Sequence, residues 1–147
     1  FKNKIESTLF AGIYNEEIFR ELKNKKNKIV IKDSISKKKI SISIDKFYLK
    51  NDNAIIISNN NTVIFTKYRK PFHYLSDFRE LNINLKKYKI LIVKSGYLSP
   101  ELKKLNADNF MILTDGFVTQ DFKRIKNLFR EKPIYPFQKN FRYNIAI

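Results

Sequence analysis

The chain of 147 residues has no cysteine, no tryptophan, one histidine and three glycines. Without cysteine it can form no disulfide, no thiolate metal site and no cysteine nucleophile, which excludes a secreted disulfide scaffold. With glycine only at Gly12, Gly96 and Gly116, neither a G-x-G-x-x-G loop nor a Walker loop for phosphate can be written. These scarcities remove most of the usual ways of building a catalytic site.

The single histidine, His73, narrows the remaining chemistry. A zinc site usually draws on several His or Cys ligands, and a Ser-His-Asp triad would need both His73 and a G-x-S-x-G turn, which is missing. The carboxylates of Glu16 and Glu17 suit a helix start, and Asp115 before a glycine suits a turn. We therefore predict no catalytic residue and no metal ligand in this chain, and a structural or surface role for His73.

Long apolar runs are also missing. None approaches the roughly 18 residues of a membrane span, and the opening stretch, residues 1–6, does not resemble a signal peptide. We expect a cytoplasmic protein with no membrane partner. Because the first residue is Phe1 rather than Met, we also expect that further sequence precedes it.

Acidic residues are few: 30 Lys and Arg face 14 Asp and Glu, which gives a formal net charge of +16. Such a charge is compatible with a basic nucleic-acid-binding module that has no enzymatic activity. However, lysine far outnumbers arginine, the residue that phosphate and base recognition favours, and the lysines are scattered. The richness in Ile, Lys and Asn is typical of an AT-rich coding sequence. We therefore favour compositional bias and keep nucleic-acid binding as the alternative.

The apolar patterns predict a mixed fold that combines α/β and α+β features. We expect a single domain over residues 1–147, with a mixed β-sheet, short flanking helices and an antiparallel hairpin section. A strand, a helix capped by Asn15 and a second strand would form a βαβ-like opening. The expected strands are residues 8–13, 28–31, 39–45, 54–57, 62–66, 89–93 and 109–114.

Turn and cap residues complete this prediction. An asparagine-rich turn, residues 58–61, should join the two hairpin strands. Ser76 should cap one short helix, and Ser99 with Pro100 should start another. The apolar run of residues 89–93 is continuous rather than alternating, so we expect both of its faces to be covered.

Two loops follow predicted strands and carry hydrogen-bond donors. Lys94 and Ser95 come directly after the most apolar strand, where α/β folds place ligand-binding loops. They could bind an anionic or peptide-like group, or Lys94 could simply reach solvent while Gly96 permits a turn. The stretch from Thr66 to Phe72 is either a solvated basic loop or a substrate contact.

Several ordered motifs resemble the C-terminal part of the MlrC family of microcystin-degradation-type metallopeptidases. Phe78-Arg79-Glu80-Leu81-Asn82-Ile83, for example, is similar to the family segment F-R-x-L-G-I. Three departures stand out: Asn82 replaces a usual Gly, Asp115 replaces a common Pro, and Lys25-Lys26-Asn27 replaces a glycine-rich turn. The other matching stretches are residues 11–17, 63–72, 88–95, 113–116 and 130–136.

The resemblance implies a hydrolase, either a zinc-dependent peptidase or an amidohydrolase. Its zinc would be held by Asp and His residues of an N-terminal domain that this chain does not contain. That catalytic domain of the same protein would be the partner, and the substrate would be a peptide or amide. The residues expected to line the substrate cleft are Thr66, Arg69, Lys94 and Ser95.

Overall fold

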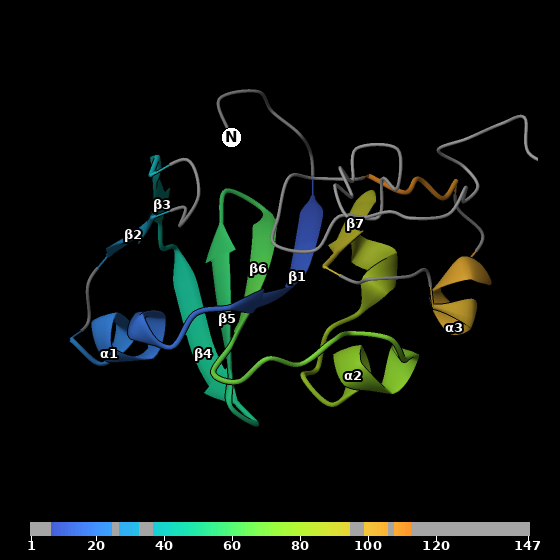
Figure 1. The fold of residues 1–147 in the computed structure, drawn as a ribbon, viewed down its shortest axis with the longest axis horizontal. Coiled ribbons are helices and arrows are strands. Elements are labelled where there is room, and N and C mark those ends of the chain that lie inside the picture. Colours follow the sequence, from blue (N-terminus) through green and yellow to red (C-terminus); the bar gives the residue numbers. More distant parts are fainter. Residues whose placement is uncertain (1–6, 25–26, 33–36, 95–98, 106–107, 113–147) are drawn as a thin grey trace, which may run out of the picture. The chain divides into compact units, whose positions relative to one another are not determined.

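The computed structural model describes residues 7–24, 27–32, 37–94, 99–105 and 108–112. Contacts divide the chain into two compact units, Phe1–Asn109 and Phe110–Ile147. Every described helix and strand belongs to the first unit (Figure 1). A single domain over residues 1–147 stays a prediction, because only residues 110–112 of the second unit are described.

The centre of the first unit is a five-stranded mixed sheet with the strand order β4-β5-β6-β1-β7. β1 runs parallel to both β6 and β7, whereas β5 runs antiparallel to β4 and β6. The strands are β1 (Thr8–Tyr14), β4 (Lys46–Lys50), β5 (Asn53–Ser58), β6 (Asn61–Thr66) and β7 (Ile90–Val93). The predicted mixed sheet with an antiparallel hairpin section is therefore confirmed.

Smaller elements accompany this sheet. Two strands, β2 (Lys28–Lys32) and β3 (Lys39–Ser43), form a separate antiparallel ribbon. The helices are short, as predicted: α1 (Glu17–Lys23), α2 (Leu75–Arg79), the 3-10 helix η1 (Leu85–Lys87) and α3 (Pro100–Lys103).

Each face of the sheet packs against its own hydrophobic cluster. On one face, Leu9, Ala11 and Ile64 pack with side chains from α2, α3 and the segments around them, such as Phe78. On the other face, Val63 and Phe65 belong to a cluster that also contains buried residues of α1 and of the β2–β3 ribbon. This alternation places successive residues of β6 in opposite clusters, as the pleat of a strand requires.

Local chemistry explains the elements that were predicted correctly. In the β5–β6 hairpin the two turn residues, Asn59 and Asn60, have φ of 47° and 64°. Asparagine tolerates this left-handed backbone, so the turn needs no glycine. At α1, the side-chain oxygen of Asn15 accepts a hydrogen bond from the Ile18 N–H (3.3 Å). Asn15 therefore supplies the predicted capping hydrogen bond, although the N-cap position itself is Glu16, which makes no side-chain cap hydrogen bond.

The predicted βαβ-like opening is wrong, because β2 pairs with β3 and not with the sheet that contains β1. The expected cap at Ser76 is also wrong, since α2 begins at Leu75. For residues 109–114 the described part, up to Ile112, forms no strand, and its Phe110 is 85% exposed.

The prediction that both faces of residues 89–93 are covered is wrong as well. Among the strands of the described residues β7 stands at the edge of the sheet, and its Ile90 and Ile92 are each 42% exposed. Leu91 and Val93, which alternate with them, pack against the cluster that contains Leu9. One face of β7 is therefore packed and the other is open.

The end of α2 explains the departure at Asn82. The Ile83 N–H donates to the Phe78 carbonyl (2.9 Å) and the Asn82 N–H donates to the Arg79 carbonyl (2.8 Å). These are the two hydrogen bonds of a Schellman motif, which puts Asn82 at the left-handed position that glycine usually takes. Its φ is 59°. Asparagine is the non-glycine residue that best accepts this conformation, so the departure leaves the helix end intact.

We predict that Asn82→Gly changes the free energy of unfolding by less than about 1 kcal/mol. Asn82→Val should lower it by about 1–2 kcal/mol or more, because a β-branched residue disfavours positive φ. Urea unfolding measures both. Glu80→Val is the matched control, since Glu80 is exposed with a φ of −57°. Equal losses in Asn82→Val and Glu80→Val would contradict the explanation.

Candidate functional site

The three parallel strands β6, β1 and β7 end at one edge of the sheet, which we call the carboxyl edge. In the register of the sheet Tyr14 of β1 pairs with Thr66 of β6. On the other side of β1, the Lys94 N–H donates to the Ala11 carbonyl (3.0 Å). The segments that follow β6 and β7 therefore start on either side of β1, beside Tyr14 and Ala11. In open α/β sheets this is the edge at which ligands bind.

Gly12 lies beneath both of these segments. The register between β1 and β6 shifts from Ala11 to Ile13, and Gly12 there has a φ of +89°, which L-residues with side chains rarely adopt. A Cβ on Gly12 would lie 3.5 Å from the Phe72 ring, 3.6 Å from the Lys94 carbonyl oxygen and 3.8 Å from the Lys70 carbonyl oxygen. Segments that are far apart in sequence thus come together over this glycine.

The four predicted cleft residues have different surroundings. Thr66 is 2% exposed, and its Oγ1 is buried without a hydrogen-bond partner. Arg69 is exposed, and its guanidinium lies 5.5 Å from the centre of the Tyr14 ring. Lys94 is exposed at the end of β7, and Ser95 lies outside the described residues. Thr66, Arg69 and Lys94 therefore all lie at the carboxyl edge, where the two cations are exposed and the hydroxyl is buried.

The other lysines of this edge are engaged with carboxylates. Lys67 Nζ lies 3.7 Å from Asp52 Oδ1, and Lys70 Nζ lies 3.1 Å from Asp77 Oδ1. The pKa of Lys67 is raised, first by its hydrogen bond and charge interaction with Tyr68 and then by Asp52. Arg69 stacks on an aromatic ring instead, which leaves its hydrogen-bonding fork available for a carboxylate or a carbonyl group.

Asp77 holds the loop between β6 and α2 in place. Its Oδ2 accepts hydrogen bonds from the backbone N–H groups of His73 (3.0 Å) and Tyr74 (2.9 Å). Burial raises the pKa of this carboxyl, but the hydrogen bonds from Tyr74, Lys70 and His73 outweigh it, and the net result is a pKa below the usual value. Asp77 therefore acts as an anion that anchors the start of α2.

The same loop is tied to α3. The Ser99 hydroxyl donates to the His73 carbonyl, and Glu101 Oε2 accepts from the Leu75 N–H (2.8 Å). These contacts place the backbone of His73 between α2 and α3. The sequence interpretation missed the role of Asp77, although an acidic residue at the third position of a helix is a signal for this kind of cap.

Within the part of the chain that the structure describes, no three His, Cys, Asp or Glu side chains gather into a group that could hold a metal ion. No helix of that part is long and apolar enough to cross a membrane.

We predict that Asp77→Asn lowers the free energy of unfolding by about 1–2 kcal/mol near neutral pH, because the anionic cap and its contact with Lys70 are lost. Since folding lowers the pKa of Asp77, its contribution is full above the unfolded value of about 4 and is lost as pH falls through the folded value. Urea unfolding between pH 7 and pH 3 should therefore show a gap to wild type that narrows on acidification. Glu80→Gln is the control, and a gap independent of pH would contradict this role.

Comparison with known proteins bears on the described residues from Lys32 onward, and β1 and α1 lie outside the matched range. The model of the MlrC C-terminus family matches residues 32–127, which is more than half of the chain and includes Thr66, Arg69 and Lys94. No curated protein and no solved structure matches the chain. The predicted resemblance is confirmed. The chain belongs to the MlrC C-terminus family.

Proposed function

We propose that this chain is the accessory domain of a cytoplasmic zinc-dependent peptidase or amidohydrolase and lines the substrate cleft of that enzyme. Membership of the MlrC C-terminus family supports this proposal. The catalytic partner is the N-terminal domain of the same protein. The zinc, held there by Asp and His residues, would activate water for attack on a carbonyl group. We assign no zinc ligand and no catalytic residue to this chain.

The observation that carries the proposal is the convergence at the carboxyl edge. Arg69 and Lys94 are exposed there, on segments that follow different strands: Arg69 lies over Tyr14 at the end of β1, and the Lys94 N–H is bonded to Ala11 of the same strand. A peptide or amide substrate offers carbonyl oxygens, and often carboxylates, which are the acceptors that guanidinium and ammonium groups bind. In this proposal Arg69 and Lys94 orient the substrate, and Ser95 adds a donor beside Lys94.

Thr66 has a different place in the proposal. Its hydroxyl is buried and without a hydrogen-bond partner, although burying such a group costs about 1–3 kcal/mol. A polar group of the substrate that entered between the segments after β6 and β7 would satisfy it. We therefore assign Thr66 the innermost contact of the cleft.

The test uses the full-length protein, purified with its metal content measured, and a peptide substrate that it hydrolyses. We predict that Arg69→Ala and Lys94→Ala each raise KM about tenfold with little change in kcat, because they remove binding that is equal in the ground and transition states. Lys28→Ala, an exposed lysine of the β2–β3 ribbon, is the matched control. Hydrolysis by residues 1–147 alone, or unchanged KM in both variants, would overturn the proposal.

The alternative is a basic module that binds nucleic acid, and the formal charge of +16 is the observation that favours it. That function requires an affinity for DNA or RNA that falls steeply with salt concentration. Binding measured at several salt concentrations therefore separates the two functions, and we expect weak binding with a shallow salt dependence.

A further inference from the structure

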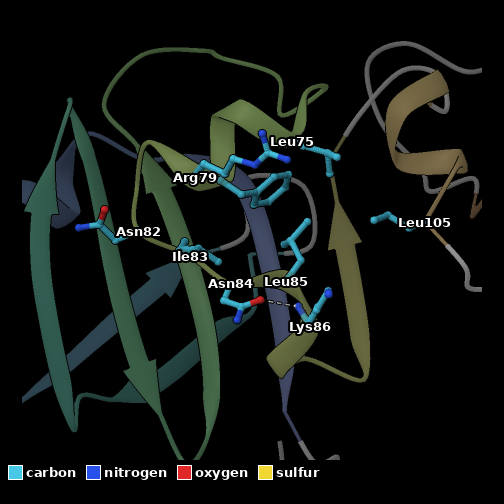
Figure 2. A pocket seen from close by; sticks show the side chains of 9 residues that line it. Leu75, Arg79, Asn82, Ile83, Asn84, Leu85, Lys86 and Leu105 are labelled. Atoms are coloured by element: carbon cyan, nitrogen blue, oxygen red, sulfur yellow. Dashed lines mark hydrogen bonds between the residues drawn. The ribbon is translucent and has the colours of Figure 1, made fainter.

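A groove lies between α2, η1 and Leu105, which follows α3, and none of its lining residues is assigned to the substrate cleft (Figure 2). Its volume is about 430 Å³, within the range of ligand-binding sites in proteins. The lining comes from four places in the chain: α2, the turn after it, η1 with the residue before it, and the segment after α3. The residues that line it are Leu75, Phe78, Arg79, Asn82, Ile83, Asn84, Leu85, Lys86 and Leu105.

The floor of the groove is apolar. Phe78 and Ile83 are buried members of the core cluster on this face of the sheet. Leu75, Leu85 and Leu105 pack against the same cluster but are only partly buried, so they present apolar surface to the groove. Figure 2 shows Leu105 facing the other two across the opening. An occupant that covered these three leucines would remove apolar surface from water.

The ionisable residues of the lining are both cations, Arg79 and Lys86, and both are exposed. Neither takes part in the ion pairs found among the described residues, which use Arg20, Lys67 and Lys70. Asn84 accepts from the Lys86 N–H (3.0 Å) and so fixes the backbone at the start of η1. An apolar floor with an unneutralised cationic rim selects for an occupant that is both apolar and acidic.

We propose that this groove docks an acidic amphipathic segment of a partner protein. Such a segment places apolar side chains over the three leucines and carboxylates against Arg79 and Lys86. A second copy of this chain is a poor occupant because each copy carries a charge of +16. The remaining residues of the chain, 113–147, have seven Lys and Arg against three acidic residues, so they also lack the complementary charge.

The probe is a fluorescent helical peptide of about 12 residues, made of glutamate with leucine and phenylalanine at i, i+3, i+4 and i+7 spacing. We expect it to bind the 147-residue chain, and to shift the backbone amide NMR signals of residues 75–86 and 105 on titration. A peptide with alanine at the apolar positions should bind at least about tenfold more weakly. A peptide with lysine in place of glutamate should not bind.

Variants distinguish peptide binding in the groove from binding that depends only on the general positive charge of the chain. The double change Arg79→Glu with Lys86→Glu should lower the affinity for the peptide at least about tenfold. Lys28→Glu with Lys39→Glu changes the net charge equally at two exposed lysines of the β2–β3 ribbon. This control should lower the affinity for the peptide much less. Equal weakening by both pairs, equal binding of the alanine peptide, or shifts confined to other residues would overturn the proposal. Substrate hydrolysis by the full-length protein with the two groove changes should stay normal, which keeps this test independent of the substrate cleft.

Discussion

β1 is the strand on which the rest of the described structure depends. It is hydrogen-bonded to β6 on one side and to β7 on the other, both in parallel. Leu9 and Ala11 are buried in the cluster on one face, while Phe10 and Ile13 pack against the cluster on the other. Parallel pairing is also what creates the carboxyl edge, because an antiparallel neighbour would carry its following loop to the opposite end of the sheet. The bulge at Gly12 then lets the backbone of those loops approach β1 closely.

The elements that could be predicted from the sequence are those whose signals are local. A turn built on Asn59 and Asn60, or a cap supplied by Asn15, is determined by a few neighbouring residues. Strand partners are not local, and the partner of β2 and the place of β7 in the sheet were predicted wrongly, although the local cap at Ser76 was wrong too. The β2 strand alternates, with Ile29 fully buried and Val30 47% exposed, which is typical of a one-sided antiparallel strand. In sequence, however, β2 and β7 both present a continuous apolar run, so nothing in either run shows that one face of the strand is exposed.

The candidate site was predictable only in part, because some of its features are visible in the sequence and others depend on the folded chain. Thr66 ends an apolar strand and Arg69 and Lys94 follow apolar strands in the sequence, and residues after parallel strands meet at one edge. The sequence could not tell that Thr66 is buried while Lys94 is exposed. It also could not reveal that Asp77 ties down the loop that carries Arg69. That role depends on hydrogen bonds to His73 and Tyr74, which form only when the chain folds back before α2.

The scarcity of acidic residues has a structural consequence. Several carboxylates of the described part accept hydrogen bonds from backbone N–H groups: Asp77 from His73 and Tyr74, Asp45 from Asn59, and Glu101 from Leu75. A carboxylate that accepts such a hydrogen bond is held in a turn or a helix cap, where it satisfies a backbone donor. It is then available only to cations that lie close by, as Lys70 does beside Asp77. Since 14 acidic residues face 30 basic ones, cations such as Arg69, Arg79 and Lys86 keep a positive field at the surface. Complementary negative charge for that field has to come largely from outside the chain, and both proposals rest on this imbalance.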